Sequence, residues 1–341
     1  MIKSVLLKNF KKYTAYKVDD LNRHNFIIGK NASGKTTILD AISLLNYKNL
    51  PIELCKKDFI EDFFLKFEMK NGHEVTIESL NNKKIYKLNE KNVTLAKLSS
   101  HFKVFYLNSH IHYSFFSTTE CRRDVINNLT NILIDSTHLQ NFSEYSKLLF
   151  RRTKILQTAD FNSSINSIML DKIEKQIADI GLFLHKNIFK FCLKINDLDY
   201  DDFDVRLSVL SMFEEDLTPE FFAKKLKDSR NLDLQSNRTT FSVHRFDVNL
   251  ECFLKEHWLN KDLLSNSQKK VAILNLFLKV MLLLKETDII FLLDEYSAFF
   301  DEFTEDIVFK KLNQIKFQFF ATDLHFVHKD NQDCKLLNLD I

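Results

Sequence analysis

Hydrophobic residues along the chain fall into two patterns, one typical of buried strands and the other of amphipathic helices. The five apolar residues at 289–293 do not alternate with polar ones, which is typical of a strand buried on both faces of a mostly parallel sheet. A shorter apolar run at 25–28 predicts a second strand. Apolar spacings of three and four predict helices over 37–45, 120–133, 139–156 and 165–194. The chain is therefore expected to adopt an α/β fold with a mainly helical segment between its ends.

Two of the scarce glycines mark a candidate site. Only four glycines occur in 341 residues, and Gly29 and Gly34 are spaced as G-x-x-x-x-G-K-T. Glycine is needed where the backbone takes a positive φ or closely approaches a ligand. In this motif, backbone N–H groups surround phosphate oxygens, the lysine reaches the β and γ phosphates, and the hydroxyl binds Mg²⁺. A strand before the motif and a helix after it supply the expected context, and the helix N-terminus adds a partial positive charge.

The motif predicts ATP binding through eight consecutive residues. They are Gly29, Lys30, Asn31, Ala32, Ser33, Gly34, Lys35 and Thr36. A turn that matches the motif by accident is the alternative interpretation. In so glycine-poor a chain, the chance of such a match is on the order of one in a thousand.

Composition narrows the class of protein. The chain is 45% hydrophobic and 28% charged, as expected for a globular protein of one or two domains. Its first residues lack the apolar core of a signal peptide, and the apolar run at 271–284 is interrupted by Lys279 and too short to span a bilayer. Five isolated cysteines predict reduced thiols rather than disulfides or a zinc site. We therefore expect a cytoplasmic protein without a membrane partner.

Net charge and codon bias give little further information about the function of the chain. The net charge is +2, so any DNA-binding face must be local. Phenylalanine, lysine, asparagine and isoleucine, which have AT-rich codons, are favoured over glycine, proline and arginine. This bias indicates drift in an AT-rich genome, in which glycines of a motif can be replaced.

Hydrolysis would need a strand that ends in an acid able to hold Mg²⁺. One candidate is Asp135, but it lies within a helical pattern. The better candidate is the strand at 289–293, which ends in Asp294 and Glu295 at the edge where open α/β sheets bind ligands. Asp294 would hold the metal together with Thr36, and Glu295 would be the catalytic residue that polarises the attacking water. An acidic strand end that only caps a loop is the alternative.

Asp294 lies far in sequence from residues 29–36, the phosphate loop. The N- and C-terminal halves of the ATPase head, the domain that binds ATP, are therefore expected to be separated by an insertion. We place the N-terminal half at 1–118, a mainly helical lobe at 119–236 and the C-terminal half at 237–341. The helix over 165–194 would extend for about 45 Å. Core packing in a hairpin or small bundle is the simplest role for its apolar residues.

Segments along the whole chain resemble motifs of the RecF family of bacterial DNA replication and repair proteins, which are ATPases related to the heads of SMC and ABC proteins. The similar segments are 9–13 (N-F-R-N-Y in the family), 119–124 (S-E-R-R-R), 145–154 (Y-x-x-x-L-x-Q-R-N-x), 177–181 (L-A-x-x-G) and 239–248 (T-x-x-G-P-H-R-D-D-L). The resemblance implies a split P-loop ATPase head of the ABC/SMC type, with the helical lobe as a short inserted arm.

The resemblance also assigns roles in the C-terminal half. Ser265, Ser267 and Gln268 occupy the place of the family's signature S-Q-G-Q-Q-R, which contacts the γ-phosphate held by a partner subunit. From the residues alone, Ser265 or Asn266 would be a helix N-cap. Asp301 is similar to the acid of the S-E-L-D loop, and Thr322 to the T-T-D switch.

Four departures from the family's motifs bear on activity. Ala32 and Ser267 each stand where the family has glycine, 242–243 replaces G-P, and 107–110 replaces F-S-P-E-D. Ser267 adds a Cβ at a close contact, which affects the closure of two heads around ATP.

The resemblance implies a DNA-binding ATPase of DNA replication, recombinational repair and the SOS response. It would dimerise around ATP and Mg²⁺ on single-stranded or gapped DNA, act with RecR and RecO to load the recombinase, and hydrolyse ATP slowly with stimulation by DNA. The alternative is a non-hydrolysing ATP-binding scaffold. A nuclease-linked ATPase is disfavoured, because only about 40 residues follow Asp301. Candidate DNA contacts are Arg122, Arg123, Arg151, Arg152 and Lys154, although a solvated helix surface would look the same.

Overall fold

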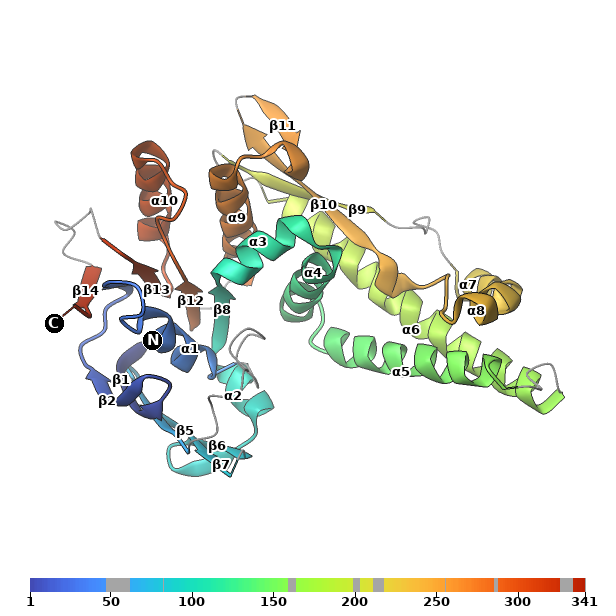
Figure 1. Cartoon of the computed structure of the whole chain (residues 1–341), viewed down its shortest axis with the longest axis horizontal. Helices are drawn as coiled ribbons and strands as arrows, with labels where there is room; N and C mark the ends of the chain where they lie inside the picture. The colour runs from blue at the N-terminus through green and yellow to red at the C-terminus, as the bar shows by residue number, and fades with distance from the viewer. Residues whose placement is uncertain are drawn as a thin grey trace. The chain divides into compact units, whose positions relative to one another are not determined.

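The computed structural model describes residues 1–46, 62–81, 83–158, 164–198, 203–210, 218–254, 256–284, 288–325 and 334–340. The chain forms two compact units: unit 1 contains 1–112 and 285–341, and unit 2 contains 113–284. Unit 1 thus combines the two ends of the chain, and the residues of unit 2 lie between these ends in the sequence, as the colours of Figure 1 show. The boundary expected at 236 is wrong, because residues 237–284 belong to unit 2 and include a strand that pairs with β9 (Val205–Leu210).

Unit 1 contains the parallel sheet that the sequence predicts. Its strand order is β14-β3-β13-β12-β8, and all four pairings are parallel. The strands are β3 (His24–Ile28), β8 (Lys103–Leu107), β12 (Ile289–Leu293), β13 (Gln318–Asp323) and β14 (Cys334–Asn338). All five residues of β12 are buried, as its unbroken apolar run predicts. The phosphate loop follows β3, and the acids Asp294 and Glu295 follow β12.

A second sheet in unit 1 is antiparallel, with the order β2-β1-β4-β5-β6-β7. Its strands are β1 (Ile2–Phe10), β2 (Tyr13–Val18), β4 (Phe64–Met69), β5 (Glu74–Leu80), β6 (Lys83–Leu88) and β7 (Lys91–Val93). The helices among the described residues of this unit are α1 (Lys35–Ser43), α2 (Leu95–His101), α3 (Ser109–Ser117), which continues into unit 2, and α10 (Glu302–Gln314).

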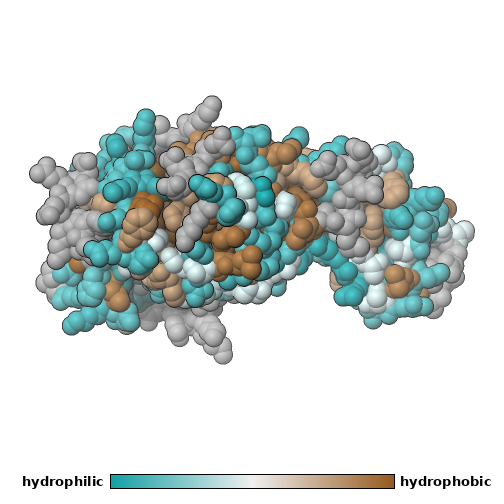
Figure 2. All heavy atoms as spheres, turned by 90° about the horizontal axis from the view of Figure 1, so that it is seen from above, coloured by the Kyte–Doolittle hydropathy of each residue, from teal (hydrophilic) through white to brown (hydrophobic). Residues whose placement is uncertain are grey.

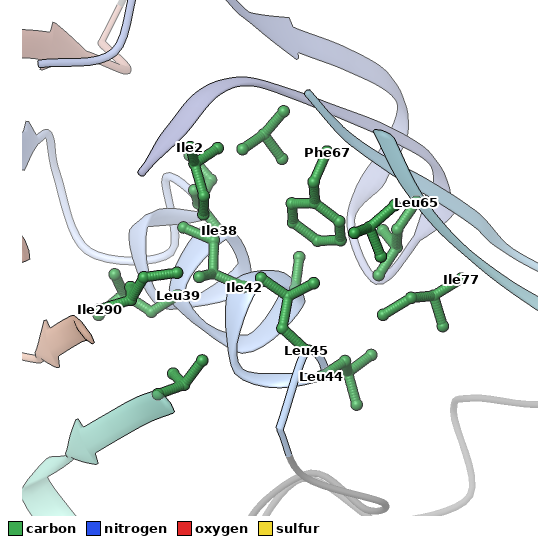
Figure 3. Packing of buried hydrophobic residues seen from close by; sticks show 14 of the residues in the cluster. Ile2, Ile38, Leu39, Ile42, Leu44, Leu45, Leu65, Phe67, Ile77 and Ile290 are labelled. Atoms are coloured by element: carbon green, nitrogen blue, oxygen red, sulfur yellow. The ribbon is translucent and has the colours of Figure 1, made fainter. Parts of the chain in front are cut away.

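Helix α1 lies in the core of unit 1. Ile38 and Ile42 of α1 belong to one buried cluster with Leu65 and Phe67 of the antiparallel sheet and Ile290 of the parallel sheet (Figure 3). Burying a side chain of this size contributes roughly 1.5–3 kcal/mol. The helix that begins at the phosphate loop is therefore held by apolar contacts to both sheets.

Unit 2 is built around helix α6 (Ser164–Asn196), which contacts α5, α7 and β9. The other helices are α4 (Thr119–Leu133), α5 (His138–Leu156), α7 (Pro219–Asp228), α8 (Arg230–Ser236) and α9 (Asn266–Leu284), and short 3₁₀ turns lie at Val243–Arg245 and Lys261–Leu263. Helices α4, α5 and α6 confirm the three helices predicted for the insertion. A Cβ on Gly181 would lie 3.0 Å from the Tyr145 ring, so this glycine permits α5 and α6 to approach closely.

A three-stranded antiparallel sheet in unit 2 was not predicted. Its order is β11-β10-β9, with β10 at Asp247–Leu254 and β11 at His257–Asn260. On β10, Val248, Leu250 and Cys252 are buried and alternate with more exposed residues. This period of two is typical of a strand with one buried face.

Lys279, which interrupts the apolar run of α9, is fully buried in unit 2. Its ammonium group pairs with Asp204 at 2.6 Å and donates to the carbonyls of Ile195 and Val205 at 3.0 and 2.9 Å. The charge is thus paired and hydrogen-bonded, as a buried charge must be. Helix α9 is tied by this lysine to the end of α6 and the start of β9.

None of the described helices is both long and apolar enough to cross a membrane. On the face shown in Figure 2, groups of hydrophobic residues are interspersed with hydrophilic ones.

Candidate functional site

The phosphate loop connects β3 to α1 and has the backbone that its glycines permit. Gly34 has φ +103°, and a Cβ at this position would lie 2.5 Å from the hydroxyl oxygen of Tyr13. Ala32, which stands where the family has glycine, has φ +61°. A residue with a Cβ pays about 1–2 kcal/mol for this left-handed conformation. The alanine at position 32 therefore strains the loop.

The cationic side chain of the loop is held by the loop itself. The Lys35 ammonium group donates to the carbonyl oxygens of Gly29 and Lys30, at 2.5 and 2.9 Å. Both acceptors are backbone carbonyls of the phosphate loop, so the ammonium group can replace either hydrogen bond with one to a phosphate oxygen. Lys35 is therefore positioned for the phosphate role that the motif predicts.

Thr36 and Asp294 are brought together although 258 residues separate them. The Thr36 hydroxyl donates to both carboxylate oxygens of Asp294, at 3.2 and 3.3 Å, and the Thr322 hydroxyl donates to the same carboxylate. The three residues come from the start of α1, the end of β12 and the end of β13. Burial is the main cause that raises the pKa of Asp294, and the neighbouring Glu295 raises it further.

The Asp294 cluster has the donors that Mg²⁺ prefers. Hydroxyl and carboxylate oxygens are hard ligands, and Mg²⁺ in nucleotide sites uses one or two carboxylates together with substrate phosphates and waters. A cation beside Asp294 would also offset the cost of its desolvated charge. The residues present therefore fit a magnesium site.

Glu295 and Asp301 lie after β12 in the same unit. Glu295 is exposed, and its backbone N–H donates to the Thr322 hydroxyl at 2.9 Å. Asp301 is the N-cap of α10, where its carboxylate accepts from the Thr304 N–H at 2.8 Å. The hydrogen bond from Thr304 is the main cause that lowers the pKa of Asp301. Asp301 thus has a local structural role in the single chain.

The alternative metal acid, Asp135, has hydrogen-bond partners within its own turn. Asp135 follows α4 in unit 2, and its carboxylate accepts from the N–H and hydroxyl of Thr137 at 2.8 and 2.7 Å. These local hydrogen bonds lower its pKa. The acid that bonds the threonine of the phosphate loop is Asp294.

Two groups beside the phosphate loop have no predicted role. The Asp340 carboxylate accepts from the Lys30 N–H at 2.7 Å. The turn between β1 and β2 supplies Lys12, whose ammonium group donates to the Ala32 carbonyl at 2.8 Å. The contact to Asp340 spans 310 residues and gives no local sequence signal. Lys12 lies in the 9–13 segment that resembles a family motif, and this segment was a usable signal.

In the single chain, the signature residues form the N-terminal cap of α9. The Ser265 N–H donates to the side-chain oxygen of Gln268 at 2.8 Å, and the Gln268 N–H donates to the Ser265 hydroxyl oxygen at 3.3 Å. This reciprocal arrangement is a capping box. Ser267 lies in the first turn of the helix. The structure therefore shows the capping role, and the contact with a partner's phosphate stays a prediction.

Two of the five candidate DNA contacts are wrong. Arg122 is 5% exposed and donates from two nitrogens to Asp247, at 2.8 and 2.7 Å. Arg152 is fully buried and pairs with Glu174 and Asp233, at 2.9 and 2.6 Å. Both guanidinium groups hold unit 2 together, because a buried charge requires such partners.

The other three candidates differ in their accessibility. Arg123 is half-buried and donates to the carbonyl of His244 at 2.6 Å. Arg151 and Lys154 are exposed on α5, and the Lys154 ammonium group lies 5.4 Å from the centre of the Phe150 ring. The surface that could meet an anion is therefore the side of α5 that carries Arg151 and Lys154.

Comparison of the sequence with models of known protein families finds no match. The chain is similar to curated proteins described as DNA replication and repair protein RecF. It is 25% identical over 367 residues to the one from Rickettsia bellii (strain OSU 85-389), covering 98% of each chain. It is 27% identical over 345 residues to the one from Rickettsia massiliae (strain Mtu5), covering 94% of this chain and 93% of the relative.

Solved structures show the same relationship at the level of the fold. The chain matches a structure of the recombination mediator protein RecF in the RecFOR pathway with a TM-score of 0.77 and 20% identity, covering 98% and 94% of the two chains. An Smc head domain derived from Pyrococcus furiosus matches with a TM-score of 0.50 and 15% identity, covering 95% and 89%. The fold is therefore that of RecF and of the SMC heads, as predicted.

Proposed function

We propose that this chain, a homologue of RecF along nearly its whole length, is an ATP- and DNA-binding protein of DNA replication and recombinational repair. The observation that carries the proposal is the convergence of Thr36, Asp294 and Thr322 behind a well-formed phosphate loop. These residues lie at the carboxyl ends of neighbouring parallel strands, where open α/β sheets bind ligands.

In this proposal the N–H groups of residues 29–36 and the Lys35 ammonium group hold the phosphates of ATP. Thr36 and Asp294 hold Mg²⁺, which neutralises charge on the phosphate oxygens. Glu295 is exposed one residue beyond Asp294, and its carboxylate would accept a proton from the attacking water. Thr322 orients Asp294 and holds the backbone of Glu295, so it couples the two acids.

Two copies would close around ATP, each providing its signature to the other's phosphate loop. Ser265 is exposed, and its hydroxyl hydrogen remains available because the capping box uses only the oxygen and the backbone N–H. Ser267 and Gln268 would approach the same phosphate from the first turn of α9. Following the RecF pattern, the dimer would bind single-stranded or gapped DNA in the cytoplasm, take part in the SOS response, and act with RecR and RecO to load the recombinase.

A second candidate function is a non-hydrolysing ATP-binding scaffold for the same repair process. Two replacements of glycine favour it: Ala32 strains the phosphate loop, and Ser267 adds a Cβ to the helix turn that would meet the partner. The two candidates share ATP binding and differ in head closure and turnover. In the first, hydrolysis is slow and stimulated by DNA.

Sedimentation velocity with ATP, with ADP and without nucleotide, each with and without gapped DNA, tests the proposal. We expect a dimer only with ATP, and DNA that co-sediments with the protein. Lys35→Met should abolish the ATP-dependent dimer while the chain stays folded, because within the described residues the Lys35 ammonium group forms its hydrogen bonds with backbone carbonyls of its own loop. Unchanged ATP affinity in folded Lys35→Met would contradict the assignment of the loop. Phosphate release measured on the same samples separates the enzyme from the scaffold.

A further inference from the structure

Unit 2 contains a cavity of about 330 Å³ that the nucleotide site does not use. Its wall includes Phe150, Lys154 and Gln157 from the end of α5, together with Arg238, His244 and Arg245. Arg245 ends the 3₁₀ turn at Val243–Arg245, and Arg238 follows α8. A cavity of this size is at the lower end of the range for small-molecule sites and can hold one nucleotide.

The cavity is positively charged. Lys154, Arg238 and Arg245 line it, and its lining contains no aspartate or glutamate. None of the three forms an ion pair with a carboxylate among the residues that the structure describes. The nearby acids Glu174 and Asp233 are instead neutralised by the buried Arg152. The three charges are therefore available to an anionic ligand.

His244 also lines the cavity, and its pKa is lowered. Burial, with smaller contributions from Arg245 and Arg123, lowers the pKa of His244 to about 4. At neutral pH its ring is uncharged and hydrogen-bonded to the Ser242 hydroxyl. An anion in the cavity would thus be held by the three permanent cations and not by the histidine.

An aromatic ring stands at the rim of the cavity. Phe150 is 64% exposed, so its ring is accessible to a ligand. The Lys154 ammonium group lies 5.4 Å from the centre of this ring, and the Gln157 amide donates to the side-chain oxygen of Asn237 at 2.9 Å beside it. Cations, an open aromatic face and side-chain amides together are the groups that bind the phosphate, the flat face and the polar edge of a nucleotide.

We propose that this cavity binds one unstacked nucleotide of single-stranded DNA, with its phosphate held by Lys154, Arg238 and Arg245 and its base stacked on Phe150. The inference rests on the proposed DNA-binding function and assigns a place and a strand type to it. A duplex keeps its base faces covered, so only a single strand can offer a base to Phe150 without a cost of unpairing. An acidic peptide could satisfy the cations, but it would leave the ring and amides without a role.

Fluorescence anisotropy of the full-length protein with a labelled 15-nucleotide oligo-dT tests this assignment, without nucleotide and with ATP. We expect Phe150→Leu and Arg245→Gln each to weaken binding about tenfold, or roughly 1.4 kcal/mol. For Arg245→Gln the slope of log affinity against log salt should decrease by about 0.7, because one phosphate contact is lost from a single strand. Arg238→Gln should weaken binding in the same way. Because the Arg238 side chain is exposed, the loss of affinity could not be attributed to misfolding. Lys175→Gln, an exposed cation on α6 outside the cavity, is the matched control and should change little.

The outcomes separate this inference from the proposed function. If the wild type binds oligo-dT and the cavity variants bind it equally well, the cavity assignment is overturned and the proposed function stands. If the wild type dimerises with ATP but binds no DNA, the DNA part of the proposed function is overturned as well. Equal losses on a blunt duplex of the same length, or equal competition by poly-glutamate and oligo-dT at matched charge, would overturn the single-stranded nucleotide.

Discussion

Asp294→Asn tests whether the carboxylate behind the phosphate loop exists to hold a cation. The substitution keeps the shape of the side chain and removes its charge. In the chain alone, Asp294 is 9% exposed and accepts from two threonine hydroxyls, and burial raises its pKa. Because a raised pKa means that folding disfavours the charged form, this group's contribution to stability decreases as the pH rises above 3.8, its unfolded value. The asparagine variant should therefore be no less stable than the wild type without nucleotide.

The magnitude of the effect follows from linkage. A ligand at 100 times its Kd stabilises the folded state by about 2.7 kcal/mol. With about 2.1 cal/mol/K of unfolding entropy per residue, the 341 residues give about 0.7 kcal/mol/K, so Mg²⁺ and ATP should raise Tm by about 4 °C. If Asp294→Asn weakens the magnesium-dependent complex 100-fold, the remaining stabilisation is about 0.4 kcal/mol, a shift of less than about 1 °C.

Differential scanning fluorimetry with ATP and Mg²⁺, with ATP and EDTA, and without nucleotide measures this shift. Asp135→Asn is the matched control, since Asp135 is an acid that bonds only within its own turn in the described chain. It should keep the full shift of the wild type. A full magnesium-dependent shift in Asp294→Asn, or its loss in Asp135→Asn, would refute the assignment of the metal acid.

Three further predictions concern turnover, head closure and acid stability. Glu295→Gln should keep ATP and Mg²⁺ binding but slow phosphate release and accumulate the dimer in sedimentation, and normal turnover would contradict its catalytic role. Ser265→Arg should block the ATP-dependent dimer. Mixing it with a Lys35 variant should restore part of the dimer, because one of the two sites then has both an intact phosphate loop from one chain and an intact signature from the other. If Ser265 is only a helix cap, the substitution should cost about 1 kcal/mol of stability and mixing should restore no dimer. Burial lowers the pKa of His138 to about 4, so the wild type should lose about 3 kcal/mol of its free energy of unfolding between pH 6.5 and pH 4. Urea titrations should show a smaller loss for His138→Gln, and an equal loss in the two proteins would contradict the lowered pKa.

Several features were predictable from sequence because their signals are local. The phosphate loop is a contiguous motif, and its glycines take the positive φ values that the motif requires. Strand β12 is an unbroken apolar run, and α4, α5 and α6 have a helical period over many residues. In each case neighbouring residues alone specify the conformation, so tertiary context changes little.

Other features depend on residues that are distant in sequence. The guanidinium group of Arg122 meets Asp247 across 125 residues, and that of Arg152 meets Asp233 across 81. A basic residue on a helix looks the same in sequence whether a buried acid or solvent faces it, so the sequence alone predicts both as DNA contacts. The strands of unit 2 were missed for a different reason. Their alternation, as at Val205 and Leu207, is short, and only the pairing of β9 with β10 gives it a buried face.

The two interpretations of Ser265 use different atoms of one residue and are physically compatible. The capping box uses the hydroxyl oxygen as an acceptor for the Gln268 N–H and uses the Ser265 N–H as a donor. A phosphate bound to the partner subunit would accept a hydrogen bond from the Ser265 hydroxyl, whose hydrogen the capping box does not use. The phosphate would also lie at the positive N-terminal end of α9. Forming the dimer therefore need not break the cap, and the cap fixes the direction of the helix before ATP binds. We predict that closure is limited by the Cβ of Ser267, two residues further along in the first turn of α9, where the RecF family has glycine, and the strength of the ATP-dependent dimer measures that cost directly.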